Sequence, residues 1–271
     1  MPATPPAFAA ARLRGTILRL AYQGSTVHIA CAFSLVEILA VLYRRHLRLG
    51  AGPGDPARDY LVLSKGHGVM AQYACLHELG WLNDTHIKAY CSDGSELKGL
   101  SETGMPGLEV NSGSLGHGLA IGLGLAYGAL RKGSGQCVYA VLGDGECNEG
   151  SIWESLLFAA QFKLSNLLVI VDANGYQAMG PTREIMDLGD LEAKFRAFGF
   201  EACTVDGHDE RLLDETISRL VRSSFSGPRA IIARTVKGKG ISFMEEGNLW
   251  HYSRLNEQTY EAALLELGMR P

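Results

Sequence analysis

Short apolar runs alternate with longer stretches of helical spacing along most of the chain. In the central part, apolar residues 138–142 precede helical spacing over residues 149–162, and a second apolar run follows at residues 167–171. Strands are also predicted at residues 60–63, 201–205 and 230–233. This alternation predicts an α/β fold, a three-layer sandwich in which helices cover both faces of a mostly parallel sheet.

The same pattern predicts a single domain over residues 1–271. Glycine is abundant, with 33 residues, but the excess falls in short motifs, and no Gly/Ser run or internal repeat marks a linker. We expect residues 1–9 to form a flexible arm. Residues 237–271 are expected to form a C-terminal tail with a loop and a helix at 257–267.

Composition and charge are typical of a soluble enzyme subunit. Hydrophobic residues make up 46% of the sequence, and 25 Lys and Arg nearly balance 29 Asp and Glu. A net charge of −4 without a basic cluster argues against nucleic-acid binding. The sequence contains no apolar run of about 18 residues, the length that a membrane span needs, and the N-terminus lacks the charged start of a secretory signal. The six cysteines show no CxxC or zinc-like pairing, so we expect them to be reduced in a cytoplasmic protein.

The segment with the clearest chemistry contains Gly143-Asp144-Gly145 after one central strand and Asn174 after the next. In a strand–helix–strand unit both strands run the same way, so we expect Asp144 and Asn174 to emerge at the same carboxyl edge of the sheet. A carboxylate, an amide oxygen and one backbone carbonyl suit Mg²⁺, and Ca²⁺ or Mn²⁺ would accept the same ligands. Gly143 and Gly145 leave room for a phosphate, and the Gly145 N–H lies near the start of a helix, which favours anions.

An isolated Gly-Asp-Gly is more often a tight turn, but its spacing to Glu149-Gly150 and to Asn174 is similar to the thiamine diphosphate signature. The whole chain resembles the N-terminal subunit of a split transketolase. The resemblance implies a thiamine diphosphate-binding domain of the diphosphate type, with the metal bound by Asp144, Asn174 and Tyr176. Further segments match in the family's order: Gly24-Ser25-Thr26-Val27-His28, Leu63-Ser64-Lys65-Gly66-His67, Pro106-Gly107-Leu108-Glu109, Ser112-Gly113-Ser114-Leu115-Gly116-His117-Gly118, Lys237-Gly238-Lys239-Gly240 and Trp250-His251.

The resemblance also assigns expected roles to single residues. Equivalents of His28, His67 and His251 contact the diphosphate or substrate and move protons, so these three are the candidate catalytic residues. His117 matches less clearly, and the other histidines have the structural role that is usual for this residue type. The family contacts the aminopyrimidine ring through backbone groups at the positions of Gly113 and Leu115. The candidate cofactor-binding residues are His67, Gly113, Ser114, Leu115, Gly143, Asp144, Gly145, Glu146, Asn174, Lys237 and His251.

The implied reaction is transfer of a two-carbon ketol unit from a ketose donor to an aldehyde or related acceptor. In this family, a glutamate of a second, pyrimidine-binding domain activates the cofactor, and no such domain fits after Val236. We therefore expect a partner, a C-terminal transketolase subunit that carries this domain and the catalytic glutamate. Two copies of each chain would form an α2β2 heterotetramer, and Glu149 is a candidate residue at the interface.

The sequence departs from the family's pattern at two places on the substrate side. Gly99-Leu100-Ser101 stands where the family has a Gly-His-Pro-like motif whose histidine helps to bind the donor sugar. Ala30-Cys31 replaces a small Gly-Gly pair next to His28. Both changes predict a specialised substrate, with a less polar acceptor as one hypothesis.

Other interpretations remain open at this point. The chain could belong to another thiamine diphosphate enzyme, one that is similar to deoxyxylulose phosphate synthase or to a dehydrogenase E1 component, or it could be a non-catalytic regulatory subunit. A Rossmann oxidoreductase is disfavoured because Tyr127 stands where a third glycine of G-x-G-x-x-G would follow Gly122 and Gly124. The small residues of this helical stretch predict close packing, and one hypothesis places Gly122 in contact with a partner subunit.

Overall fold

A five-stranded parallel sheet forms the centre of the protein, which we describe from a computed structural model over residues 7–245 and 247–270. The strand order is β1-β2-β3-β7-β6. The strands are β1 (Tyr60–Leu63), β2 (Val138–Gly143), β3 (Leu167–Ala173), β6 (Glu201–Asp206) and β7 (Arg229–Arg234). All five strands predicted from apolar runs are confirmed, each with its start within one residue of the prediction. The runs are continuous because the central strands are buried on both faces.

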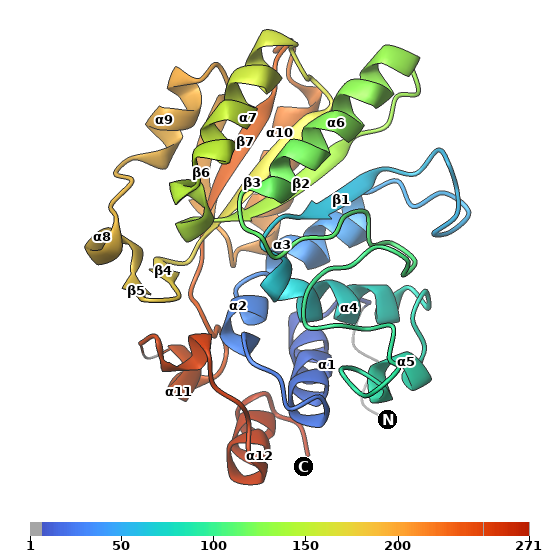
Figure 1. Cartoon of the computed structure of the whole chain (residues 1–271), viewed down its shortest axis with the longest axis vertical. Helices are drawn as coiled ribbons and strands as arrows, with labels where there is room; N and C mark the ends of the chain where they lie inside the picture. Colours follow the sequence, from blue (N-terminus) through green and yellow to red (C-terminus); the bar gives the residue numbers. More distant parts are fainter. Residues whose placement is uncertain (1–6, 246, 271) are drawn as a thin grey trace.

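Helices cover both faces of the sheet, as the predicted three-layer sandwich requires (Figure 1). On one face lie α6 (His117–Lys132), α7 (Gly150–Gln161) and α9 (Leu191–Ala197), which share a hydrophobic cluster with side chains of the strands. The other face carries α3 (Val36–Val41) and α10 (Glu210–Arg222), while α1 (Ala10–Gln23) and α4 (Val69–Glu78) lie below the sheet in Figure 1, beyond the ends of its strands; all four helices belong to a second, larger cluster. The layers therefore enclose one core on each side of the sheet.

Short elements connect these layers and shape the edge where the parallel strands end. Turns of 3-10 helix follow β1 at Gly66–Gly68, β2 at Gly145–Asn148 and the last strand at Leu249–His251, and a π-helical turn lies at Leu42–His46. The remaining elements are α2 (Ile29–Phe33), α5 (Asp84–Lys88), β4 (Tyr176–Gln177), β5 (Gly180–Pro181), α8 (Thr182–Ile185) and α11 (Ser242–Glu245).

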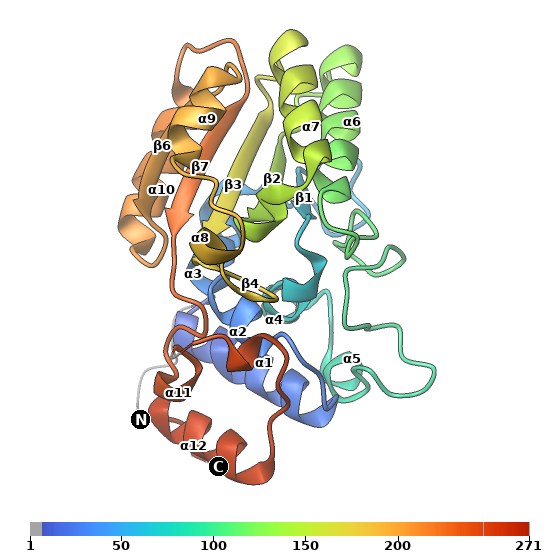
Figure 2. The same cartoon turned by 60° about the vertical axis from the view of Figure 1, so that its left-hand side comes forward.

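The C-terminal tail returns to the first helix of the chain. Its helix, α12 (Glu257–Glu266), confirms the helix predicted at 257–267 and packs beside α1 (Figure 2). Tyr22 of α1 and Tyr260 of α12 stack with ring centroids 4.3 Å apart. The tail thereby brings its 3-10 turn, with His251, next to α2.

Two expectations about the chain's surfaces need correction. Phe8 belongs to the predicted flexible arm, yet its side chain is 6% exposed and stacks on Tyr43, because an apolar ring gains stability from burial. The part of that arm before residue 7 lies outside the described residues. Gly122 does not face outward either: a Cβ there would lie 3.6 Å from Val62 and 3.7 Å from Val138, so the small residue serves packing of α6 on the sheet.

Across residues 7–245 and 247–270, every helix falls short of the length or apolar character that crossing a bilayer requires.

Candidate active site

A cavity of about 460 Å³ opens at the edge where β1, β2 and β3 end. Its wall combines segments that lie far apart in the sequence: the start of α2, the turns after β1 and β2, the loop before α6, the β4–β5 hairpin and the C-terminal tail. The wall contains most of the residues that the sequence singled out, namely His28, His67, Gly113, Leu115, Gly143, Asp144, Gly145, Glu146, Asn174, Tyr176 and His251. The predicted convergence at one edge of the sheet is therefore found.

Asp144 begins the turn after β2 and points its carboxylate at the neighbouring strand end. Oδ1 accepts a hydrogen bond from the Gly145 N–H at 2.8 Å, and Oδ2 accepts one from the Gly175 N–H at 2.7 Å. The side chain is buried, and burial together with the charge of Asp172 raises the pKa of Asp144 to about 6. Among the described residues Asp144 takes part in no ion pair, so its negative charge is not balanced by a contacting cation.

Asn174 follows β3 and has its amide orientation set by its neighbours. Its Nδ2 donates to Oδ2 of Asp172 at 3.2 Å and to Oγ of Ser34 at 3.4 Å, while Oδ1 accepts from the Tyr176 N–H at 3.1 Å. Both Asn174 and Tyr176 line the cavity beside Asp144. A carboxylate, an amide oxygen and a backbone carbonyl are hard donors that fit a divalent cation such as Mg²⁺. The raised pKa of Asp144 agrees with this fit, because a cation would relieve the unbalanced charge.

A buried ion pair supports this edge of the sheet from below, and the sequence did not reveal it. Nζ of Lys65 lies 2.5 Å from Oδ2 of Asp172, and neither side chain is more than 2% exposed. Asp172 also accepts hydrogen bonds from the hydroxyl groups of Ser34 (2.6 Å) and Thr235. Burial lowers the pKa of Lys65, but the charges of Asp172, Cys31 and Asp144 and the hydrogen bond to Asp172 together outweigh it, so the net pKa is raised and the lysine stays charged. One signal was present: Asp172 is an acid inside an otherwise apolar strand run.

The three candidate catalytic histidines meet in the cavity although they come from three segments. The ring centroids of His28 and His67 are 5.3 Å apart, those of His28 and His251 are 5.2 Å apart, and those of His67 and His251 are 5.9 Å apart. Burial lowers the pKa of all three imidazoles, and for His251 burial and the charge of Lys237 lower it to about 3. Without a ligand the three rings are therefore neutral at physiological pH.

Lys237 supports this cluster from behind and does not line the cavity. Its Nζ donates to Oδ1 of Asn248 at 2.7 Å and to Nδ1 of His251 at 2.6 Å, and it lies 5.5 Å from the centre of the Tyr176 ring. Since Nδ1 of His251 accepts this bond, the ring proton of His251 is on Nε2. The predicted cofactor-binding residue Lys237 thus acts on the cavity through His251.

Glu146 occupies the cavity wall, but its carboxylate is used by the protein. Oε1 accepts from Oγ of Ser64 at 2.5 Å and from the Gly116 N–H at 2.8 Å, and Oε2 accepts from the Gly143 N–H at 3.1 Å. One buried side chain therefore holds together the turn after β1, the loop before α6 and the end of β2. These contacts make Glu146 a structural brace, and the cofactor contact predicted for it from the sequence stays a prediction.

The predicted cofactor-binding residues of the loop before α6 lie partly in the cavity wall and partly at the surface. Gly113 and Leu115 line the cavity, but Ser114 is exposed, with its hydroxyl 3.4 Å from Nδ1 of His117. His117 is also exposed and lies outside the histidine cluster. Glu149 is exposed at the rim of the cavity, a place compatible with the predicted interface role.

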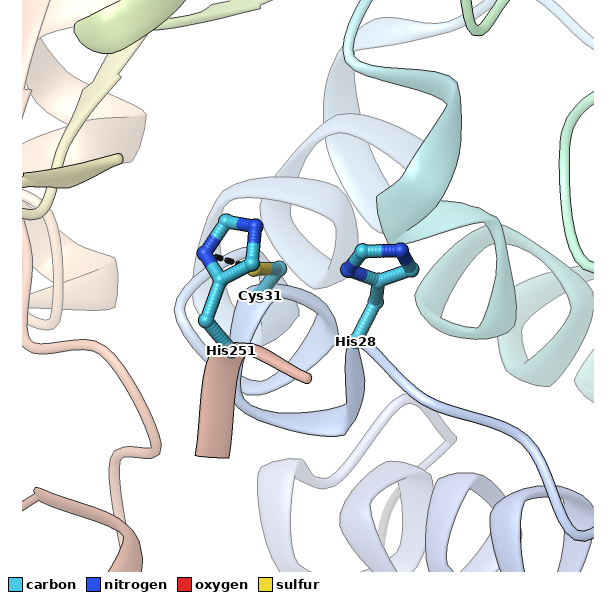
Figure 3. A group of neighbouring side chains, drawn as sticks. All are labelled: His28, Cys31 and His251. Carbon is cyan, nitrogen blue, oxygen red and sulfur yellow. Dashed lines mark hydrogen bonds between the residues drawn. The ribbon is translucent and has the colours of Figure 1, made fainter. Parts of the chain in front are cut away.

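Both sequence departures lie in the wall of this cavity. Leu100 is 40% exposed and covers Gly113, whose added Cβ would meet its Cδ1 at 2.7 Å. Cys31 projects from α2 between His28 and His251 (Figure 3), and its Sγ lies 3.8 Å from Nδ1 of His251. An apolar side chain and a thiol therefore line the space beside the histidines.

Comparison with known proteins gives one consistent match. The family described as "Transketolase, thiamine diphosphate binding domain" matches residues 17–271. An apulose-4-phosphate transketolase subunit of Actinobacillus succinogenes is 40% identical over 89% of this chain and 87% of that protein. The 6-deoxy-6-sulfo-D-fructose transketolase subunit SqwG of a Clostridium species is 36% identical over 89% of this chain and 88% of that protein.

Among solved structures, the transketolase of Campylobacter jejuni superposes with a TM-score of 0.88 and 28% sequence identity. The match covers 97% of this chain and 42% of that one, so the chain spans about two fifths of the length of this solved transketolase.

Proposed function

The chain belongs to the transketolase family, as its thiamine diphosphate-binding domain, and we propose that it is the cofactor-anchoring subunit of a two-component transketolase. The observation that carries the proposal is the cavity in which Asp144, Asn174 and the three histidines converge. Two relatives that are named as subunits of transketolases match this chain over 87% and 88% of their own length, which favours the same division into subunits.

The residues of the cavity fit a metal–diphosphate group by their chemistry. Asp144, Asn174 and the backbone carbonyl of Tyr176 would hold Mg²⁺, with Ca²⁺ or Mn²⁺ as substitutes. Gly143 and Gly145 have no side chain that would block a phosphate at the start of this helical turn, while their own N–H groups already bond to Glu146 and Asp144. Gly113 and Leu115 would contact the aminopyrimidine ring. The volume of about 460 Å³ falls within the range of small-ligand sites.

When bound, thiamine diphosphate supplies the electron sink for breaking a carbon–carbon bond beside a ketose carbonyl. The residues of this chain would bind the charged groups of the cofactor and exchange protons near the reacting atoms. His251 offers a proton on Nε2, because Lys237 occupies its Nδ1. The Nδ1 atom of His28 is buried without a hydrogen-bond partner among the described residues, so it is available to exchange a proton with a ligand. Positive charge on Lys65 and Lys237 helps to keep these rings neutral, and an anionic diphosphate would offset that effect.

A partner subunit completes the site in this proposal. It carries the pyrimidine-binding domain and the catalytic glutamate, and two copies of each chain form an α2β2 heterotetramer with Glu149 at an interface. Exposed apolar side chains on the outer face of α6 and α7 support a protein contact: Leu157 is 61% exposed, Phe162 43% and Ile121 43%. Met179 at the cavity rim is 76% exposed, which fits a surface that a partner covers.

We also place the complex in the cytoplasm. All six cysteines are free thiols, as the sequence predicted, and unpaired thiols are typical of a reducing compartment.

The substrate is proposed to be a specialised sugar rather than the common xylulose and ribose phosphates. Leu100 and Cys31 give the cavity wall an apolar side chain and a thiol next to the histidines. A less polar acceptor would contact these side chains without losing hydrogen bonds. Turnover of xylulose and ribose phosphates at ordinary transketolase rates would contradict this part of the proposal. Leu100→His is expected to improve the use of hydroxyl-rich sugars, while Leu100→Phe, which adds no hydrogen-bonding group, is not.

Calorimetric titration of thiamine diphosphate with Mg²⁺ tests the proposed function directly. The chain is titrated alone and then mixed with the product of a neighbouring gene that encodes the second subunit. Binding that is tight only in the mixture is expected if the site is shared. Asp144→Ala should abolish both binding and turnover, whereas the exposed Asp93→Ala is the matched control and should retain both. Absence of binding in either sample, with folded protein, would overturn the proposal.

A further inference from the structure

Three side chains in the cavity wall have the composition of a soft-metal site. His28, Cys31 and His251 each offer one ligand atom, and these atoms all lie within 4.8 Å of one another. His28 and Cys31 are three residues apart, at the N-cap and in the first turn of α2, so the same short helix positions both. His251 comes from the 3-10 turn of the C-terminal tail, which packs against α2 (Figure 3).

The geometry points to a binding site for Zn²⁺ or a similar borderline-soft cation, formed by His28, Cys31 and His251. Zn²⁺ binds sulfur at about 2.3 Å and imidazole nitrogen at about 2.0–2.1 Å, so tetrahedral ligation places a sulfur and a nitrogen about 3.6 Å apart. Sγ of Cys31 is already 3.8 Å from Nδ1 of His251. The remaining pairs need a closure of no more than about 1.5 Å to reach tetrahedral spacing, so the site requires the imidazole rings to move toward Cys31 when the metal binds.

Polar surroundings agree with this assignment. Nδ1 of His28 is buried and has no hydrogen-bond partner among the described residues, a state that costs free energy unless a ligand satisfies the atom. On binding, Zn²⁺ displaces the thiol proton of Cys31 to solvent and the sulfur coordinates as a thiolate. With three protein ligands, the fourth position stays open to water or to a ligand in the cavity.

The site is chemically distinct from the Mg²⁺ site proposed at Asp144 and Asn174. Oxygen donors suit Mg²⁺, whereas a thiolate and two imidazoles favour Zn²⁺ over Mg²⁺. Lys237 opposes the bound cation by its charge and by its hydrogen bond: its Nζ lies 2.6 Å from Nδ1 of His251 and takes the one lone pair of that atom, so Zn²⁺ at Nδ1 must displace this bond. Removing that charge is therefore expected to strengthen the binding of Zn²⁺, whereas removing the Cys31 thiol is expected to weaken it.

Cobalt titration of the chain alone tests the site without any enzymatic assay. Co²⁺ bound to a thiolate shows sulfur-to-metal charge-transfer absorption in the near ultraviolet, and Zn²⁺ should displace it stoichiometrically. We expect Cys31→Ser to abolish this absorption and to weaken Zn²⁺ binding by at least about tenfold, the lower end of what even an outer-shell partner costs. Cys91→Ser is the matched control, because Cys91 is an exposed thiol outside the cavity, and this variant should bind like the parent.

Lys237→Met provides the second measurement and should tighten Zn²⁺ binding. Co²⁺ binding without thiolate absorption would overturn the assignment, and so would equal Zn²⁺ affinity for Cys31→Ser and the parent.

A consequence for activity rests on the proposed function. If His28 and His251 move protons in the reaction, Zn²⁺ at this site inhibits the two-subunit enzyme, and a chelator selective for Zn²⁺ over Mg²⁺ restores it. We expect half-inhibition near the dissociation constant measured for the chain, and at least tenfold resistance in Cys31→Ser. Turnover that is insensitive to Zn²⁺ at saturating occupancy would overturn this consequence. Absence of turnover in zinc-free enzyme supplied with Mg²⁺ and thiamine diphosphate would instead contradict the proposed function, while the cobalt result stands by itself.

Discussion

Replacing Asp144 by Asn is expected to leave the cofactor-free chain as stable as the parent or more stable, although the residue is buried. Burial and Asp172 raise the pKa of Asp144 from 3.8 to about 6. The difference is about 2 units, and each unit corresponds to about 1.4 kcal/mol, so the charged carboxylate destabilises the native state by about 3 kcal/mol at neutral pH. Asn carries no charge and its one oxygen can accept from only one of the N–H groups of Gly145 and Gly175, so its NH₂ group would face the other at a cost of about 1–3 kcal/mol.

The number of protons that the native and unfolded states bind determines how the free energy of unfolding changes with pH. Between pH 3.8 and about 6 the native state of the parent binds more protons than the unfolded state, so the parent loses stability as the pH rises through this window. Asp144→Asn lacks the titrating group. The free energy of unfolding of the variant minus that of the parent should therefore increase by about 2.4 kcal/mol from pH 4 to pH 7.

Urea unfolding of both proteins at several pH values, in buffer with a chelator, measures this difference. Asp172→Asn is the matched comparison, because it removes the partner of the buried Lys65 and should cost about 3–5 kcal/mol. In the mixture with the partner subunit, Mg²⁺ with thiamine diphosphate should stabilise the parent and leave Asp144→Asn unchanged. The reasoning is refuted if the Asp144→Asn difference does not grow with pH, or if the variant is destabilised by more than about 2 kcal/mol at neutral pH.

Three further outcomes are expected. His208 and Arg14 bind the buried Glu37 and lower its pKa despite its burial, so Glu37→Gln should cost about 3 kcal/mol at pH 7 in urea unfolding. The gap to the parent should shrink as the pH falls below the ordinary value of 4.5, and a gap independent of pH would contradict the role of the charge. Gly118→Ala would place a Cβ 2.6 Å from the Cα of Ser64 and should lower the thermal midpoint by several degrees, which calorimetry measures. Leu157→Asp should weaken assembly with the partner in size-exclusion chromatography without lowering the thermal midpoint of the isolated chain, since Leu157 is 61% exposed.

Much of the fold followed from the sequence because the buried strands of this architecture consist of continuous apolar runs. β2 and β3 are buried on both faces, so the first polar residues after each apolar run mark the strand ends. Asp144 stands in the turn after β2, and Asn174 is the first residue after β3. The topology of parallel strands then places these two residues at one edge. The position of Gly122 could not be obtained this way, because the small residues of α6 face both the sheet and the outside.

Side-chain partnerships across long sequence distances were the part that patterns did not reveal. Lys65 and Asp172 are 107 residues apart, and Glu146 joins donors from three separate segments. Periodicity reports which face of an element is buried, but it carries no information about which polar group meets which. For this reason a cofactor contact of Glu146 could be predicted from the sequence, but not the hydrogen bonds that its oxygens accept from Ser64, Gly116 and Gly143.

The unequal pairing of the two aspartates indicates what the cavity is built to bind. Asp172 stands beside Gly143 in the sheet register and is paired with Lys65, so the pair carries no net charge even though the Asp172 carboxylate still raises the pKa of Asp144. Within residues 7–245 and 247–270, Asp144 has backbone donors but no contacting cation, and its raised pKa records that imbalance. On the other side of the cavity a positive charge is unbalanced. Lys237 bonds to a neutral His251, and its ammonium group contacts no carboxylate in the same described ranges. A ligand that brings a cation to Asp144 and an anion toward Lys237 would satisfy both ends, and a metal–diphosphate group has this arrangement of charge.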